Sequence, residues 1–307
     1  MGRNPGWLPG LVSGSLAGVL TNLLLKSIES NTYIQMKKYL FIALVIVLAA
    51  CNGNEVVPVE TPVTNTKSSG IAAPQNINLN IIGVYPHDTS AYTQGLEIHN
   101  GKLYEGTGNF ESSSLRISDI KSGKVEHKHM MGTKKIFGEG ITIFNNKIYQ
   151  LTWQSNIVNV YDLNNIDKPI KTFNWPYEGW GITHTDTELI ISDGSSNLYF
   201  VNPVDFRIRS TIQVTNNEGP VDSINELELI NGFVFANIYT HDNIIKIDPA
   251  NGHVVGNINL PGLIRQYVPK YVPKDGEVLN GIAYDSTSKK VYITGKNWPK
   301  MFEATFN

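Results

Sequence analysis

Five short motifs recur along the chain. In each one a polar or aromatic residue stands at the same position, directly before a segment in which apolar and polar residues alternate. They read Gln94-Gly95-Leu96, Glu139-Gly140-Ile141, Trp180-Gly181-Ile182, Asn225-Glu226-Leu227 and Asn280-Gly281-Ile282. None of the five leading residues is an ordinary filler of an apolar core, and Glu139 is the only carboxylate among them. A positioned carboxylate can accept a proton from one group and return it to another. Glu139 is therefore the first candidate for acid–base chemistry.

A second set of equivalent residues is predicted at the end of each following strand. Aligning these strands brings five residues to one level: Gly108, Trp153, Gly194, Tyr239 and Lys296. The two sets should lie side by side, because in an antiparallel pair the start of one strand is next to the end of its partner. Together they supply one carboxylate, one ammonium, several amides and aromatic rings, which is the composition of a small-ligand pocket. In the alternative reading, Glu139 and Lys296 form a structural ion pair that plugs the site.

The spacing of the motifs predicts how these residues are positioned. Successive motifs begin 41 to 55 residues apart, which is the period of propeller blades built from four short strands. An additional alternating segment lies before the first repeat, at 77–85. The fifth repeat has only three such segments, at 281–284, 291–295 and 301–305. We therefore predict an all-β fold, a five-bladed propeller closed by an N-terminal strand that completes the last blade. Residues 260–271 are expected to form an irregular insertion or a short helical turn.

The first 76 residues resemble targeting and linker segments. A basic start at Met36 followed by an apolar run indicates a secretory signal over residues 36–50. The sequence Leu48-Ala49-Ala50-Cys51 resembles a bacterial lipobox, so Cys51, the only cysteine, is the expected lipidation site. Residues 51–76 are rich in Pro, Thr, Asn and Ser and should form a flexible tether. Residues 1–35 are interpreted as an upstream extension from a misassigned start.

These segments predict a protein that is lipid-anchored in a bacterial cell envelope, facing the periplasm or in the outer membrane. The catalytic propeller domain would span residues 77–307. We expect a monomer that is attached to the membrane through a lipid anchor.

Charge and motif content disfavour several function classes. A formal net charge of −2 provides no basic surface for nucleic acid. The seven histidines show no metal-cluster spacing, and no phosphate loop or hydrolase nucleophile motif is present. We expect no cofactor and no catalytic metal, and leave open a structural calcium ion in the channel. Glu226 and Glu228 are alternative candidates for the acid. Side chains alternate between the two faces of a strand, so Glu226 and Glu228 should lie on the face opposite to Asn225 and Leu227. At most one of these two pairs should therefore point inward.

The chain resembles the plant-type glutamine cyclotransferase family in a series of motifs. These motifs occur in the same order over nearly all of residues 80–306. They include Tyr92-Thr93-Gln94-Gly95-Leu96, Phe137-Gly138-Glu139-Gly140, Gly179-Trp180-Gly181 and Thr294-Gly295-Lys296-Asn297-Trp298-Pro299. The resemblance implies a five-bladed propeller that converts the N-terminal glutamine of peptides or proteins to pyroglutamate and releases ammonia, without a catalytic zinc.

The resemblance also implies roles for single residues. Glu139 matches the catalytic glutamate and Lys296 the active-site lysine. Substrate-binding roles are implied for Gln94, Trp153, Trp180 and Asn225. Tyr239 stands where the family often has tryptophan; it keeps an aromatic wall but is smaller and adds a hydroxyl.

The residue types suit this reaction. The α-amine must lose a proton before it attacks the side-chain carboxamide, and the departing nitrogen must gain one, so one carboxylate can serve both transfers. The pocket would hold glutamine folded back on itself. Lys296 would either keep Glu139 ionised or stabilise negative charge on the tetrahedral intermediate, and both roles stay open.

Two other function classes stay open from the sequence. A non-catalytic propeller lipoprotein that binds a peptide or glycan would keep Trp153 and Trp180 but would not require Glu139. A metal-dependent propeller hydrolase or lyase would need several Asp, Asn or His residues at the strand starts, where only Asn225 and Asn280 accompany Glu139.

Overall fold

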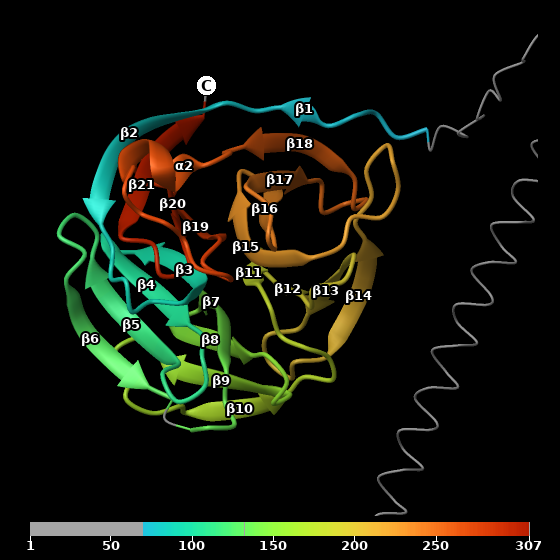
Figure 1. The fold of residues 1–307 in the computed structure, drawn as a ribbon. Coiled ribbons are helices and arrows are strands. Elements are labelled where there is room, and N and C mark those ends of the chain that lie inside the picture. The colour runs from blue at the N-terminus through green and yellow to red at the C-terminus, as the bar shows by residue number, and fades with distance from the viewer. Residues whose placement is uncertain (1–69, 132, 307) are drawn as a thin grey trace, which may run out of the picture. The chain divides into compact units, whose positions relative to one another are not determined.

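The computed structural model describes residues 70–131 and 133–306, which form five β-sheets arranged as a ring around a central axis (Figure 1). In each sheet one strand lies next to the axis and the last strand lies at the rim. The chain is thus a five-bladed β-propeller, as predicted. The predicted features at 1–35, 36–50 and Cys51, and most of the tether, lie outside the described residues.

Four blades are built from strands consecutive in the chain. The first contains, from the axis outward, β3 (Thr93–His99), β4 (Lys102–Thr107), β5 (Ser114–Asp119) and β6 (Val125–Met130). The second contains β7 (Gly138–Phe144), β8 (Lys147–Thr152), β9 (Ile157–Asp162) and β10 (Lys171–Asn174). The third contains β11 (Ile182–His184), β12 (Leu189–Ser192), β13 (Asn197–Val201) and β14 (Ile208–Gln213). The fourth contains β15 (Ile224–Ile230), β16 (Phe233–Ile238), β17 (Asn243–Ile247) and β18 (Val254–Asn259).

The fifth blade combines both ends of the propeller. Its inner strands are β19 (Leu279–Asp285), β20 (Lys290–Gly295) and β21 (Lys300–Phe306), and its outer strand is β2 (Leu79–Pro86). β2 runs antiparallel to β21, with Val84 opposite Phe302. The predicted closure by an N-terminal strand is confirmed, and it joins the first blade to the last without a gap in the ring.

One further strand precedes the closing strand. β1 (Gln75–Asn76) pairs in parallel with β18, so the fourth blade has a fifth strand at its rim. The tether was predicted to run through residue 76, whereas the strand pairing already begins at Gln75. A two-residue strand carries no periodicity, so the sequence pattern could not locate it.

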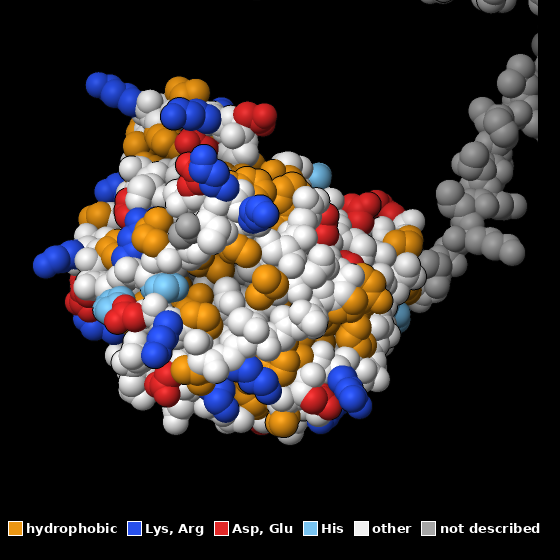
Figure 2. Space-filling view, turned by 90° about the horizontal axis from the view of Figure 1, so that it is seen from below, with side chains coloured by type: hydrophobic (Ala, Val, Ile, Leu, Met, Phe, Trp, Pro, Cys, Tyr) orange, Lys and Arg blue, Asp and Glu red, His pale blue; other side chains and the backbone are white. Residues whose placement is uncertain are grey.

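The connection between the fourth and fifth blades carries the short helix α2 (Leu263–Tyr267), which matches the predicted helical turn. Leu263 and Ile264 are buried, and the rest of the segment from 260 to 278 is irregular. No helix within the described ranges is long and apolar enough to span a membrane. On the face shown in Figure 2, basic and acidic side chains are interspersed.

Apolar side chains between neighbouring blades form the core. Leu151 and Val158 of the second blade, for example, pack in one cluster with Leu189 and Ile191 of the third. Burying such faces is the main driving force that holds sheets together.

The glycines of the repeated motifs allow the inner strands to approach one another. A Cβ atom on Gly140 would lie 2.6 Å from the backbone oxygen of Trp180. Gly95 and Gly181 face the backbone of Ile141 and Asn225 in the same way. Because only glycine leaves this room, the residues just before these glycines converge at one place near the axis.

Candidate active site

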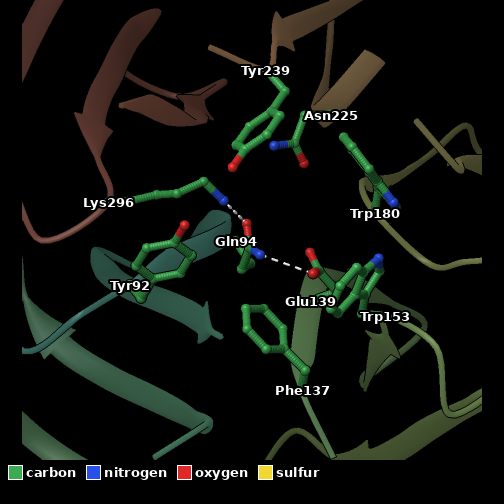
Figure 3. Close-up of a pocket in the computed structure, with 9 residues that line it drawn as sticks. All are labelled: Tyr92, Gln94, Phe137, Glu139, Trp153, Trp180, Asn225, Tyr239 and Lys296. Atoms are coloured by element: carbon green, nitrogen blue, oxygen red, sulfur yellow. Dashed lines mark hydrogen bonds between the residues drawn. The ribbon is translucent and has the colours of Figure 1, made fainter. Parts of the chain in front are cut away.

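A pocket of about 230 Å³ is formed where the inner strands converge (Figure 3). It is lined by Tyr92, Gln94, Phe137, Glu139, Trp153, Trp180, Asn225, Tyr239 and Lys296. The structure therefore brings together all seven pocket residues that were predicted, and adds Tyr92 and Phe137. Asn280 does not line this pocket; its amide nitrogen donates to the backbone oxygen of Thr93 at 2.9 Å.

Irregularities in strand pairing aim the site residues. The register shifts between Thr93 and Gly95, between Gly138 and Ile141, and at the corresponding points of β15 and β19. A β-bulge turns the affected side chains away from strict alternation and is common next to active sites. In the first, second and fourth blades the shift coincides with Gln94, Glu139 and Asn225, which all face the pocket.

Glu139 and Lys296 approach Gln94 from opposite sides (Figure 3). The Gln94 Nε2 donates a hydrogen bond to Glu139 Oε1 at 2.8 Å, and Lys296 Nζ donates to Gln94 Oε1. Glu139 is 4% exposed and Lys296 1%. The alternative of a direct ion pair that plugs the site is therefore not what the structure contains, because the Gln94 amide bridges the two charged groups.

Burial changes the protonation of both groups. It raises the pKa of Glu139 well above its usual range; the charge of Lys296 partly opposes this, and the charge of Glu178 adds to it. Burial lowers the pKa of Lys296 to about 8, against the opposing attraction of Glu139 and Glu226. A carboxyl group with a raised pKa binds a proton more readily than an exposed carboxyl group does, which suits a group that accepts a proton and returns it.

Glu178 holds the two tryptophans of the pocket. Its Oε2 accepts hydrogen bonds from Trp153 Nε1 at 2.8 Å and from Trp180 Nε1 at 3.0 Å. Its Oε1 accepts from Gln154 Nε2 at 2.8 Å. These donors, among them the two indoles, hold the pKa of Glu178 below its usual value despite partial burial, so it stays a carboxylate.

Sequence reasoning missed Tyr92, Phe137 and Glu178 as site residues, although a signal was present. Each lies two residues before a leading motif residue: Gln94, Glu139 or Trp180. Residues two apart along an extended chain share a side. The same spacing that found the leading residues could therefore have found these three.

The residues predicted at the ends of the second strands of the blades also lie at the pocket. Trp153, Tyr239 and Lys296 line the pocket, and Lys296 Nζ lies 4.8 Å from the Tyr92 ring centre and 5.7 Å from that of Tyr239. The two glycines of the set leave room for aromatic walls. A Cβ atom on Gly194 would lie 2.6 Å from the Trp180 ring, and one on Gly108 would collide with Phe137.

The expectation for Glu226 and Glu228 was wrong. Asn225 lines the pocket, yet Glu226 is also turned inward, where it accepts from the backbone N–H groups of Ile282 at 2.9 Å and Leu96 at 3.3 Å, on inner strands of two other blades. The bulge between Ile224 and Leu227 interrupts the alternation on which the expectation relied.

Glu228 and Glu97 bind neighbouring inner strands in the same way. Glu228 accepts from the N–H of Tyr284 at 2.7 Å, and Glu97 from that of Ile143 at 3.0 Å. Across residues 70–131 and 133–306, no group of three or more His, Cys, Asp or Glu side chains is arranged to hold a metal ion. The structural calcium ion stays a prediction.

Comparisons with known proteins agree with this arrangement. The sequence model of glutamine cyclotransferases matches residues 54–306. A glutaminyl-peptide cyclotransferase of Arabidopsis thaliana is 37% identical over 227 residues, covering 73% of this chain and 70% of that protein. The crystal structure of Myxococcus xanthus glutaminyl cyclase superimposes with a TM-score of 0.71 at 35% identity, covering 76% of this chain and 98% of the other. The chain belongs to the glutamine cyclotransferase family of enzymes.

Proposed function

We propose that the protein converts the N-terminal glutamine of peptides into pyroglutamate and releases ammonia, with Glu139 as the proton shuttle. One observation carries the proposal beyond family membership: a buried carboxyl group with a raised pKa faces a small pocket that has aromatic walls. The similarity to the Arabidopsis glutaminyl-peptide cyclotransferase and to the Myxococcus glutaminyl cyclase supports the same reaction.

The pocket suits a single glutamine residue. Its volume of about 230 Å³ is enclosed by the aromatic rings of Tyr92, Phe137, Trp153, Trp180 and Tyr239. These walls would hold the flexible side chain folded back, so that the α-amine meets its own carboxamide carbon. For an intramolecular reaction, such positioning supplies a large part of the rate enhancement.

Glu139 would then act twice. As the α-amine attacks the carboxamide carbon, a new C–N bond forms and the carboxylate takes the proton that the amine loses. When the tetrahedral intermediate collapses, the original C–N bond breaks and Glu139 returns the proton to the departing nitrogen, which leaves as ammonia. The proton that Glu139 takes from the amine is the one that it gives to the departing nitrogen, so no other acid or base is needed.

Lys296 and Gln94 would support this step from the other side. The Gln94 amide donates to Glu139 and so fixes the orientation of the carboxylate. The ammonium of Lys296 has N–H groups beyond the one given to Gln94, and would stabilise negative charge on the carboxamide oxygen of the intermediate. We assign Lys296 this role rather than that of an ion-pair partner, because Gln94 separates it from Glu139.

The test is ammonia release from a Gln-initiated dipeptide, with pyroglutamate identified by mass spectrometry. A Glu-initiated dipeptide, which has no carboxamide, is the matched control. We further propose that the reaction needs no bound metal, so a chelator should leave the rate unchanged. No ammonia from the Gln peptide would refute the proposed function, and loss of activity with chelator would refute the metal-free mechanism alone.

We also propose a lipid anchor at Cys51 in a bacterial envelope, supported by the lipobox-like Leu48-Ala49-Ala50-Cys51. Wild-type protein expressed in bacteria should fractionate with membranes and carry a lipid at its N-terminus, whereas Cys51→Ser should not. Wild-type protein recovered without lipid in the soluble fraction would contradict the anchor.

A further inference from the structure

The pocket has room for the N-terminal glutamine of a peptide but not for the residues that follow it. Small-molecule sites usually enclose about 300–1,000 Å³, and this pocket encloses about 230 Å³. The residues that follow the N-terminal glutamine must therefore lie outside it. A second, larger cavity of about 460 Å³ adjoins the pocket, since Tyr239 lines both.

The connection between the fourth and fifth blades forms most of this second cavity, which we call the α2 groove. Its walls come from α2 and from residues 273–278, together with Thr240 and Asp242 next to Tyr239. The side chains of Leu263, Ile264 and Trp298, which are buried, line its apolar part. Much of the rest of the lining is polar, so the groove offers both apolar contacts and hydrogen-bonding groups to a peptide.

The groove also approaches the pocket at a second point. A Cβ atom on Gly276, in the groove wall, would lie only 3.0 Å from the hydroxyl oxygen of Tyr92, which lines the pocket. Gly276 has a φ of +80°, a conformation that glycine adopts without strain. The groove thus borders the pocket along the side formed by Tyr239 and Tyr92.

The charged side chains of the groove differ in what they already bind. Asp242 accepts from the N–H of Gly262 at 3.0 Å. Glu277 accepts from the Tyr271 hydroxyl at 2.7 Å and from the N–H of Lys274 at 2.9 Å.

Three exposed charges remain in the groove. Arg265, Lys274 and Asp275 have no ion pair or side-chain hydrogen bond within the described part of the chain. The one carboxylate of these three, Asp275, precedes Gly276 and lies at the end near Tyr92, where its charge adds to the burial that raises the pKa of Tyr92. The groove lining thus carries three carboxylates, Asp242, Asp275 and Glu277, beside two cations, and only the two cations can bind an anion.

We propose that the α2 groove binds the residues that follow the N-terminal glutamine of a peptide substrate, and that Arg265 and Lys274 favour a carboxylate there. The carboxylate would be an acidic side chain or the C-terminus of a short peptide. The inference rests on the proposed function, because it extends the same substrate beyond the pocket.

The test compares ammonia release from C-terminally amidated peptides. Gln-Gly amide reaches little beyond the pocket, while Gln-Gly-Glu-Gly amide and Gln-Gly-Lys-Gly amide differ only in the charge offered to the groove. We expect the glutamate peptide to have the higher kcat/KM, by about two- to fivefold, as an exposed ion pair supplies. Gln-Gly-Gly as free acid, compared with its amide, separates a C-terminal carboxylate from a side chain.

Charge reversal assigns the preference to named residues. Arg265→Glu and Lys274→Glu should each reduce or invert the preference and leave Gln-Gly amide turnover unchanged. Lys270→Glu is the matched control, because Lys270 is exposed on the same connection but does not line the groove. It should keep the wild-type preference.

The outcomes separate the two proposals. Equal kcat/KM for all peptides, or a preference that survives both groove variants, would overturn the groove proposal while ammonia release still supported the proposed function. If no peptide released ammonia, the function would fail, and calorimetry with the same peptides would decide whether the groove binds them. Absence of charge-dependent binding there would overturn the groove as well.

Discussion

Glu139 and Lys296 lie on opposite sides of the Gln94 amide, which hydrogen bonds to both and keeps them from forming an ion pair. A carboxylate paired directly with an ammonium would stay ionised and would be a poor proton donor. With Gln94 between them, burial dominates and the pKa of Glu139 is raised. This separation favours a proton shuttle over a structural plug.

Gln94→Met tests this relationship. Methionine keeps the length of the side chain, so Lys296 and Glu139 stay apart, but it cannot donate to the carboxylate. Because the Gln94 hydrogen bond lowers the pKa of Glu139, its loss should raise that pKa further. The acid limb of the kcat/KM profile should move to higher pH and turnover at neutral pH should fall. An acid limb at the wild-type position would show that Gln94 does not tune Glu139.

Glu178 allows its charge and its hydrogen bonds to be tested separately. Glu178→Gln keeps an oxygen for both indoles but removes the charge that raises the pKa of Glu139. The acid limb should move to lower pH, with KM nearly unchanged.

Glu178→Ala is the comparison, because it also removes the acceptor that orients Trp153 and Trp180. Losing two hydrogen bonds to a charged group should raise KM by about tenfold or more. If both variants raise KM equally, the charge rather than the orientation of the indoles governs substrate binding.

Tyr239 closes the pocket against Trp180, with the two ring centres 5.7 Å apart. Tyr239→Ala should raise KM more than it lowers the melting temperature, because it removes a wall of the pocket. Tyr239→Trp should be tolerated, since tryptophan also supplies an aromatic wall. Unchanged Michaelis parameters for the Ala variant would place Tyr239 outside the functional site, and would also separate the pocket from the α2 groove.

Carboxyl groups with raised pKa values near the axis should make stability depend on pH. Burial raises the pKa of Glu97 to about 7, and burial together with the charges of Glu97 and Glu226 raises that of Glu228 well above normal. A folded-state pKa above the unfolded value means that the folded protein holds protons that the unfolded chain releases. Stability should therefore be highest at mildly acidic pH and should fall as the pH rises through about 7.

Melting temperatures between pH 5 and pH 8 check this prediction. Glu228→Gln keeps an oxygen for the N–H of Tyr284 but cannot ionise, so its melting temperature should fall less over this range. Parallel curves for the wild type and the variant would show that Glu228 ionisation does not contribute.

The fold was predictable because its signals are periodic. Motifs such as Glu139-Gly140 and Trp180-Gly181 recur at blade spacing, and the spare strand before the first repeat has one vacant partner, the incomplete last blade. Gln94, Glu139 and Asn225 could be predicted to lie together because they occupy the same position in successive repeats. This reasoning does not require knowledge of side-chain direction.

Features that depend on contacts across the ring were not predictable in this way. A bulge in β15 turns Glu226 inward against the alternation rule, and a bulge leaves little trace in one sequence. The role of Glu178 depends on two indoles from different blades meeting at one oxygen atom. The Gln94 bridge likewise depends on distances between side chains of different blades, which residue type and spacing do not determine.

Glu139→Gln tests the central claim most directly, with melting temperature and ammonia release measured on the same preparation. The amide keeps the size of the side chain but cannot accept a proton, so turnover should fall by roughly 10²–10⁴-fold or more. Glu228→Gln, a buried carboxyl outside the pocket, is the matched control and should keep its activity. The account predicts a folded and inactive Glu139→Gln protein beside an active control; a folded Glu139→Gln protein with near-normal ammonia release would contradict it.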